Sequence, residues 1–131
     1  MPGVVESIIR LGKEYALGIG TSLDRDYIDL VLRGLGVASA FNIVVTGDEI
    51  KHGKPDPETY RTLANRMRVK PGELLVLEDA KSGIDAAKAA GCWCIAIENL
   101  TAAPQDTSQA DTVVQSLNEV TEGLICSLLT T

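Results

Sequence analysis

The sequence has no long apolar run and no excess of positive charge. None of its apolar stretches approaches the roughly 20 residues that a transmembrane helix needs, and the N-terminal MPGVVESIIRLGKEY lacks the apolar core of a secretory signal. Twelve Lys and Arg residues stand against 18 Asp and Glu, which gives a formal net charge of −6. Binding to a nucleic-acid backbone or to an anionic membrane needs clustered positive charge. We therefore expect no nucleic-acid partner and no membrane partner.

Cysteine and histidine are also scarce. The three cysteines, Cys92, Cys94 and Cys126, are too few, and of odd number, for a disulfide framework. We interpret them as core thiols in a reducing compartment, which predicts a cytoplasmic location. The single histidine, His52, cannot form a metal site by itself and is expected to be solvated.

Short apolar runs alternate with amphipathic stretches along the whole sequence. This alternation is typical of βα units with a mostly parallel sheet. With 45% hydrophobic residues, the 131-residue chain is expected to form a single α/β domain, residues 1–131, with three layers because helices cover both faces of the sheet. Strands are expected at residues 15–22, 41–49, 73–79, 92–98 and 110–116. Helices are expected at residues 24–36, 57–67 (with Asp56 as N-cap), 82–91 and 118–129.

Polar residues follow the predicted strands at their carboxyl ends, where open parallel sheets bind ligands. Thr21 and Ser22 follow the first strand, Glu78 and Asp79 end the third, and Lys54 lies in the loop after the second. Hydroxyls and backbone N–H groups at a helix N-terminus can hold a phosphate, and a lysine adds a compact positive charge. Two adjacent carboxylates, with water, suit Mg²⁺. Together these residues predict a phosphate and magnesium site.

Each of these residues also has a structural interpretation that the sequence leaves open. Glu78 and Asp79 could cap the helix that follows them, because acidic side chains are favoured at helix N-termini. Thr21 and Ser22 could form an N-cap pair before the next helix. Lys54 could be an ordinary solvated lysine in a polar loop.

Three ordered motifs carry a resemblance to a known family. They are LGIGTS at residues 17–22, GDEIKHGKPDPETY at 47–60 and LVLEDAKSGIDAAKAAG at 75–91. In this order and spacing the chain resembles the haloacid dehalogenase-like (HAD-like) phosphohydrolases, in particular the β-phosphoglucomutase and phosphoglycolate-phosphatase-like branch, over essentially its whole length. The resemblance implies a Rossmann-like core and Mg²⁺-assisted phosphoryl transfer from a small phosphorylated metabolite.

The resemblance also assigns roles to the residues at the strand ends. Thr21 and Lys54 match catalytic positions of the family, a hydroxyl that binds the transferring phosphoryl group and a lysine that neutralises phosphate charge. Ser22 would add a backbone N–H to the same phosphate. Glu78 and Asp79 match the acidic motif that holds Mg²⁺, directly or through water.

One family motif is missing from the chain. Members of the family carry an aspartate nucleophile in a DxDx(T/V) motif on a strand near the N-terminus, with a second aspartate as general acid and base. The only D-x-D here, Asp24-Arg25-Asp26, lies where a helix should begin. The family's mobile helical cap, which largely selects the substrate, is also absent. The resemblance therefore implies a truncated core, with Mg²⁺ binding weak or absent without the N-terminal aspartates.

The missing strand bears on the fold. In the family it lies in mid-sheet, between the strand ending at Thr21 and the strand ending at Asp79. Its absence should leave two edges with unpaired backbone groups, which are costly. We expect the edges to close on each other in a flavodoxin-like 2-1-3-4-5 strand order, or two copies to form a homodimer through them. An N-terminal fragment or another chain that supplies the strand is the alternative.

Three functions are compatible with these observations. The first is a phosphohydrolase or phosphomutase core that acts on small phosphate esters with Mg²⁺ in its intact form, and that is inactive as the isolated chain because the nucleophile is missing. The second is a non-catalytic phosphate-binding or dimerising interaction module derived from such a phosphatase. The third, a receiver-like signalling domain, would need a phosphorylatable aspartate at a strand end, and Asp79 is the candidate.

Overall fold

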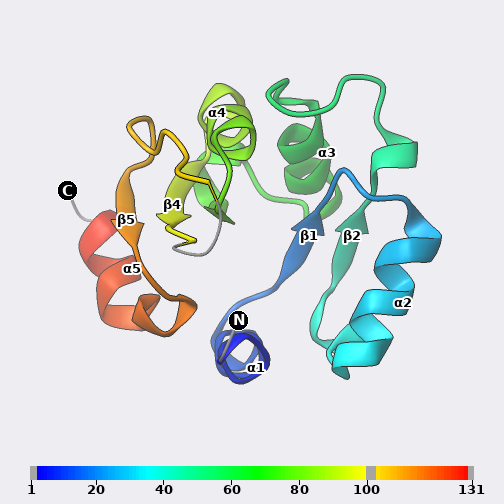
Figure 1. Ribbon diagram of the computed structural model, residues 1–131, viewed down its shortest axis with the longest axis horizontal. Helices are drawn as coiled ribbons and strands as arrows, with labels where there is room; N and C mark the ends of the chain where they lie inside the picture. The colour runs from blue at the N-terminus through cyan, green and yellow to red at the C-terminus, as the bar shows by residue number, and fades with distance from the viewer. Residues whose placement is uncertain (1–2, 100–102, 130–131) are drawn as a thin grey trace.

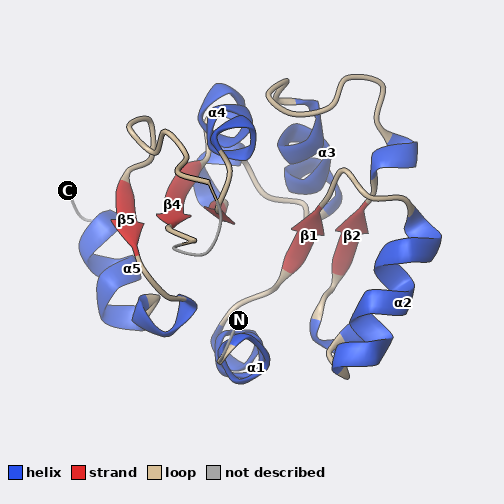
Figure 2. Ribbon diagram, viewed as in Figure 1, coloured by secondary structure: helices blue, strands red, loops and turns tan. Residues whose placement is uncertain are grey.

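Five short parallel strands cross the middle of the computed structural model, which describes residues 3–99 and 103–129 (Figure 1, Figure 2). Within these residues the strands form two sheets: β1 pairs with β2, and β4 lies between β3 and β5. The α/β class with parallel strands is as predicted, and each strand is shorter than predicted. The strand bounds are Gly18–Gly20 (β1), Ile43–Val45 (β2), Leu75–Glu78 (β3), Trp93–Ile97 (β4) and Thr112–Val114 (β5).

Helices cover both faces of the strands, so the three predicted layers are present. α3 and α4 pack on one face, and α1, α2 and α5 pack on the other. None of the described helices combines the length and the apolar character needed to cross a membrane. The helix bounds are Val4–Glu14 (α1), Arg25–Leu35 (α2), Glu58–Arg66 (α3), Lys81–Ala90 (α4) and Glu122–Leu129 (α5).

The first helix, α1, is additional to the predicted elements, and it links the two halves of the molecule. Its Ile8 packs with the α2 cluster beside β1 and β2, while its Leu11 packs with the α5 cluster beside β4 and β5. Figure 1 shows α1 below the space between the two sheets. The helix therefore contributes to both apolar clusters on its face of the strands.

Helix α2 begins after an aspartate cap and ends at a glycine. The Asp24 carboxylate accepts a hydrogen bond from the backbone N–H of Tyr27 at 2.9 Å, so Asp24 is the N-cap. At the other end Gly36 has a φ of 73°, and Gly91 ends α4 in the same way with a φ of 90°. Glycine adopts this left-handed conformation without a Cβ clash, which is why it ends helices.

The predicted start of α3 is wrong by one residue. Its N-cap is Pro57, not Asp56, and the helix begins at Glu58. Asp56 still supports this end, because its side chain accepts a hydrogen bond from the backbone N–H of Glu58 at 2.9 Å.

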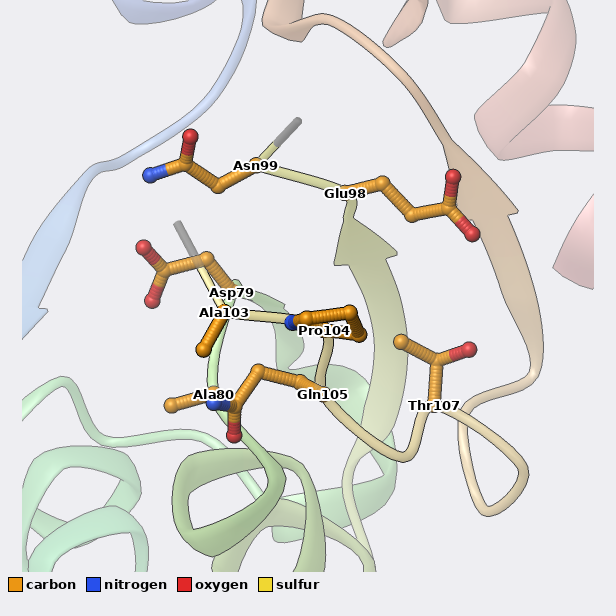
Figure 3. A pocket seen from close by; sticks show the side chains of 8 residues that line it. All are labelled: Asp79, Ala80, Glu98, Asn99, Ala103, Pro104, Gln105 and Thr107. Carbon is orange, nitrogen blue, oxygen red and sulfur yellow. The ribbon is translucent and has the colours of Figure 1, made fainter. Parts of the chain in front are cut away.

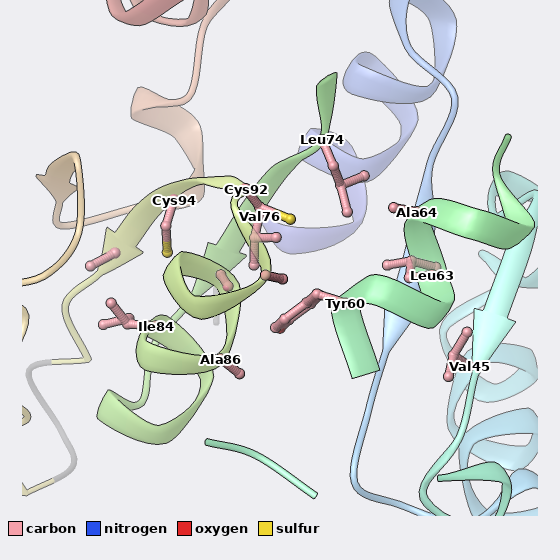
Figure 4. Close-up of a cluster of buried hydrophobic side chains, with 13 residues drawn as sticks. Val45, Tyr60, Leu63, Ala64, Leu74, Val76, Ile84, Ala86, Cys92 and Cys94 are labelled. Atoms are coloured by element: carbon pink, nitrogen blue, oxygen red, sulfur yellow. The ribbon is translucent and has the colours of Figure 1, made fainter. Parts of the chain in front are cut away.

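The largest buried cluster lies between the α3–α4 layer and the strands (Figure 4). Tyr60 and Leu63 enter it from α3, and Ile84 enters it from α4. Val45 of β2 and Val76 of β3 belong to the same cluster, although they lie in different sheets. The cluster therefore joins the two sheets through side-chain packing.

The cysteine interpretation is correct for two of the three residues. Cys92 and Cys94 are buried, and burial raises the pKa of the Cys94 thiol to about 12, so it stays protonated at neutral pH. Cys126 is exposed on α5, so its interpretation as a core thiol is wrong.

β1 and β3 are not paired, so the expected closure of the sheet does not occur in the described residues. Between them lies a cavity of about 500 Å³, lined by both strands and by residues of α1 and α3. Packed helices lie roughly 8–10 Å apart, about twice the roughly 4.8 Å between neighbouring strands. α3 packs on β1 and β2, α4 packs on β3 and β4, and the two helices touch each other. This spacing of the helices leaves a gap between β1 and β3 that is about as wide as one further strand.

The outer edge of β2 is covered by a side chain. The guanidinium of Arg25 donates a hydrogen bond to the backbone carbonyl of Val44 at 2.8 Å and forms an ion pair with Glu49 at 3.1 Å. A charged side chain on an edge strand discourages further strand pairing.

Candidate functional site

Four of the five predicted site residues meet at the carboxyl ends of β1 and β3. Thr21, Lys54, Glu78 and Asp79 all line the cavity between these strands. Ser22, the fifth, is exposed and is not among the residues that line the cavity. The site therefore lies at the opening between the two sheets.

Lys54 connects the two sheets through its ammonium group. Its Nζ lies 2.6 Å from Oε2 of Glu78, the last residue of β3, and donates a hydrogen bond to the carbonyl of Gly20, the last residue of β1, at 3.1 Å. The side chains of Lys54 and Glu78 are only 13% and 10% exposed. The interpretation of Lys54 as a solvated lysine is therefore wrong.

Tyr60 completes this contact and was not predicted as a site residue. Its hydroxyl donates a hydrogen bond to the same Oε2 of Glu78, and its ring lies 5.0 Å from the Lys54 Nζ. Burial, together with the Glu78 carboxylate, raises the pKa of Tyr60 far above its usual value, so the hydroxyl stays protonated and remains a donor. The sequence signal that could have identified it is its place in the lysine motif, on the buried face of α3.

Gly83 makes room for the Glu78 carboxylate. A Cβ at this position, in the first turn of α4, would overlap the carboxyl group of Glu78. The N-cap of α4 is Ala80, without a side-chain cap, so Glu78 and Asp79 are not the helix caps that one interpretation allowed. The backbone N–H of Lys81 instead donates to the Gln105 side chain at 3.1 Å.

The loop that carries Lys54 is held by an acidic residue of α3. Glu58 accepts hydrogen bonds from the backbone N–H groups of Lys51 and His52, at 2.9 and 3.1 Å, and these bonds lower its pKa. The His52 side chain is 70% exposed, with Nδ1 3.1 Å from the Glu58 carboxylate, so it is solvated as predicted.

Thr21 lines the cavity from the turn between β1 and α2. Its backbone N–H continues the pairing with β2 by donating to Val45 at 3.0 Å, and its hydroxyl accepts a hydrogen bond from the N–H of Leu23 at 3.1 Å. Because Asp24 is the N-cap of α2, the interpretation of Thr21 and Ser22 as an N-cap pair is wrong.

The polar residues after β2 serve the fold instead of the site. Glu49 accepts a hydrogen bond from the backbone N–H of Thr46 at 2.8 Å and forms ion pairs with Arg25 at 3.1 Å and Arg66 at 2.8 Å. The bond from Thr46 and the Arg66 guanidinium lower the pKa of Glu49 to about 2. This network ties the end of β2 to α2 and α3.

Asp79 is exposed and also faces a second pocket of about 320 Å³ (Figure 3). Glu98 and Asn99, which follow β4, line the same pocket, but the carboxylates of Asp79 and Glu98 point in opposite directions. Within residues 3–99 and 103–129 no three His, Cys, Asp or Glu side chains form a metal-binding group. Mg²⁺ usually takes six oxygen ligands, and one Glu78 oxygen already binds Lys54 and Tyr60, so these residues alone do not fit the ion.

The arrangement suits an anion better than a metal. A lysine ammonium carries three N–H donors, and Lys54 uses two of them on Gly20 and Glu78. Among the described residues the third donor meets no other hydrogen-bond acceptor, and Thr21 lines the same cavity.

The model of the family described as "Haloacid dehalogenase-like hydrolase" matches residues 1–97 of the chain. The chain is 38% identical to the validoxylamine A 7'-phosphate phosphatase of Streptomyces hygroscopicus subsp. limoneus over 104 residues. The matched region covers 79% of the chain and 48% of that protein. It is 32% identical to the phosphoglycolate phosphatase of Escherichia coli (strain K12) over 127 residues, 94% of the chain and 50% of that protein. The chain thus spans about half the length of these curated relatives.

Solved structures show the same fold. CbbY from Rhodobacter sphaeroides in complex with phosphate superposes with a TM-score of 0.82 and 26% identity, covering 90% of the chain and 54% of that protein. The β-phosphoglucomutase of Clostridium difficile superposes with a TM-score of 0.84 and 25% identity, covering 99% of the chain and 56% of that protein.

Proposed function

The chain belongs to the haloacid dehalogenase-like hydrolase family, and on that premise we propose that it supplies the phosphate-binding part of a phosphotransfer site for small phosphate esters. Two of the relatives named above are phosphatases and one is a phosphomutase. We assign phosphate binding to Thr21, Ser22 and Lys54, and the ligand is a small phosphorylated metabolite in the cytoplasm.

The observation that carries this proposal is the position of Lys54. Its ammonium lies at the carboxyl ends of two parallel strands, mostly buried, with one N–H donor left for a ligand. Thr21 lines the same cavity. Glu78 keeps the ammonium in place, so binding an anion requires no large movement of the lysine.

The metal side of the site is incomplete. Glu78 and Asp79 are the residues that would hold Mg²⁺, which would supply positive charge to the transferring phosphoryl group. Because one Glu78 oxygen is engaged by Lys54 and Tyr60, further oxygen ligands from outside these 131 residues are needed. We therefore propose weak or no Mg²⁺ binding by chain 1–131.

The cavity between β1 and β3 is the place for the missing part. It lies between two unpaired strand edges, has about the width of one strand, and is lined by Lys54 and Thr21. An added strand that runs parallel to β1 and β3 would end next to the Lys54 ammonium. An aspartate at its end could then act as the nucleophile. The described strands of the chain do not end in a D-x-D motif that would supply this aspartate. We propose an N-terminal fragment or another chain as the source of this strand.

A second candidate function is a non-catalytic phosphate-binding or dimerising module. It is favoured by the same lack of a D-x-D motif at a strand end. In this case the open edges would pair with a second copy of the chain, and phosphate binding would not lead to turnover.

A turnover assay separates the two functions. Pure chain 1–131 is mixed with para-nitrophenyl phosphate and Mg²⁺, alone and with a synthetic strand peptide that ends in Asp-x-Asp-x-Thr. The phosphotransfer proposal expects no turnover alone and turnover with the peptide, lost when the first aspartate is changed to Asn. Phosphate binding without turnover in any arm would support the module. Turnover by chain 1–131 alone that disappears in Lys54→Ala would overturn the proposed inactivity.

Phosphate binding is tested separately by NMR titration with inorganic phosphate. We expect amide shifts at Thr21, Ser22 and Lys54 that are lost in Lys54→Ala. Lys51→Ala is the matched control, because Lys51 lies in the same loop, is exposed, and removes the same charge. If Lys51→Ala weakens phosphate binding as much as Lys54→Ala, the binding depends only on the total positive charge of the loop, and the proposal fails.

A further inference from the structure

Helix α2 has a second apolar face that is not used in the core. Its Ile28 and Leu32 are buried against the strands, as expected for a surface helix. Tyr27, Leu30 and Leu35, however, are 56%, 66% and 47% exposed. The face of a surface helix that points away from the core is ordinarily polar. Figure 1 shows α2 at the right-hand edge of the molecule, away from the space between the sheets.

Two of these residues, Tyr27 and Leu30, form one stripe along the helix with Gly34, whereas Leu35 lies on the side of the buried Ile28. Tyr27, Leu30 and Gly34 follow the spacing i, i+3 and i+7, which places them on the same side of an α-helix. A Cβ at Gly34 would meet no heavy atom within 4 Å. The stripe therefore presents a tyrosine ring at one end, a leucine in the middle and a bare backbone surface at the other end.

Opposite charges border this stripe on one side. At 100° per residue, Asp26 and Arg33 fall on the same flank, four residues before and three residues after Leu30. Neither forms an ion pair with another residue in the part of the chain that the structure describes. The Arg33 Nε makes only a long hydrogen bond of 3.5 Å to the carbonyl of Asp29 in the preceding turn.

We propose that α2 is the contact surface for a second copy of this chain, with the two α2 helices antiparallel about a twofold axis that passes beside Leu30. A twofold axis makes each contact occur twice. The axis makes the two α2 helices run in opposite directions, and it places the charged flanks of both helices on the same side of the interface. Asp26 therefore faces Arg33 of the second copy. Tyr27 then covers Gly34 of the second copy, and the two Leu30 side chains meet at the axis.

The contact is small, so the dimer is weak. An 11-residue helix is about 16 Å long, and a stable interface usually buries at least about 1,200 Å² in total. We therefore expect the dimer to form only at high protein concentration. The stripe residues Tyr27, Leu30 and Gly34 are not among the residues that line the cavity of the proposed phosphate site, so the two proposals can be tested separately.

Sedimentation velocity over about 5 to 500 μM protein tests the proposal. The wild-type chain is expected to shift from monomer to dimer over this range, and Leu30→Glu is expected to stay monomeric. Ile9→Glu is the matched control, because Ile9 is 50% exposed on α1 and lies outside the stripe. A wild-type chain that is monomeric at every concentration overturns the proposal. So does a dimer that persists in Leu30→Glu, since it would use another surface such as the edges of β1 and β3.

A charge exchange tests the antiparallel register. At low salt, Asp26→Arg and Arg33→Asp should each weaken the dimer several-fold, and the double variant should restore it. In the antiparallel register the double variant only reverses the direction of each ion pair. A double variant that is no better than either single variant overturns the register.

Discussion

The ammonium of Lys54 lies 2.6 Å from the carboxylate of Glu78, and this ion pair joins the ends of two strands that share no backbone hydrogen bond. Lys54 reaches β3 through Glu78 and β1 through the carbonyl of Gly20. The residue assigned to phosphate binding is thus also a structural link between the two sheets. Its replacement should affect both stability and binding, and the two effects need separate measurements.

Lys54→Met is expected to lower the free energy of unfolding by about 3 kcal/mol, because it leaves the mostly buried Glu78 carboxylate without its cation. Urea unfolding at pH 7 measures the change. In the double variant Lys54→Met with Glu78→Gln no buried charge is left unpaired, so most of the loss should be regained. A double variant that loses the sum of both single effects would show that the pair is not coupled.

Gly83→Ala should destabilise the chain by about 1–3 kcal/mol, although alanine is the better helix former, because its Cβ would displace the Glu78 carboxylate from Lys54 and Tyr60. Gly34→Ala in α2 is the control. It has open space around the new Cβ and should stabilise the monomer by about 0.5–1 kcal/mol. Unfolding is measured at a protein concentration low enough to keep the chain monomeric. Equal effects of the two substitutions would contradict the close approach at Gly83.

Tyr60→Phe should cost about 1.5 kcal/mol, because it removes a hydrogen bond to a buried carboxylate and keeps the ring in the core. The measurement is again urea unfolding at pH 7. Tyr27→Phe, at an exposed tyrosine of α2, should change stability by less than about 0.5 kcal/mol. The prediction is wrong if the two substitutions have the same effect.

Glu49 should make stability depend on pH in acid. Its pKa is about 2 in the folded chain against an ordinary value of 4.5, so it stabilises the fold fully above about pH 4.5 and loses this effect as the pH falls toward 2. Glu49→Gln should therefore lower stability at pH 7 by up to about 1 kcal/mol, and the difference should shrink below pH 4. Glu14→Gln, at an exposed residue of α1, is the control variant for the loss of one acidic side chain.

The edges that face the cavity should be visible in hydrogen exchange. Successive residues of a strand direct their backbone N–H groups to alternate edges of that strand. Thr21 donates its N–H to β2, and the carbonyl of Leu74 accepts a hydrogen bond from β4. The N–H groups on the other edges, which face the cavity, are therefore those of Gly18, Gly20, Leu75 and Leu77. These amides should exchange at least tenfold faster than that of Ile95 in the central strand β4. Slow exchange at all four would mean that the edges are paired in solution.

Local patterns were enough to predict most of the elements. The alternation of apolar runs predicted five strands, and Asp24 and Gly91 mark a helix start and a helix end correctly because capping depends only on nearby backbone. The predicted start of α3 is one residue too early because Asp56 and Pro57 are both favourable residues at a helix start, so the local sequence does not choose between them.

The parts that could not be predicted depend on contacts between distant segments. The separation of β1 from β3 follows from the packing of α3 against α4, which no short stretch of sequence encodes. Tyr60 was missed for a similar reason: its hydroxyl matters only because α3 places it against the end of β3. For the candidate site, strand-end positions located Thr21, Lys54, Glu78 and Asp79, but not which of them touch.

The cavity between β1 and β3 sets how far strand addition can proceed. An outer strand edge that accepts a partner presents a new edge, so pairing there can continue from chain to chain. Here one extended segment would satisfy both inner edges at once and leave no new edge behind, while Arg25 covers the outer edge of β2. Association through this cavity would therefore stop at one guest strand per chain, with a fixed one-to-one stoichiometry in place of open-ended growth.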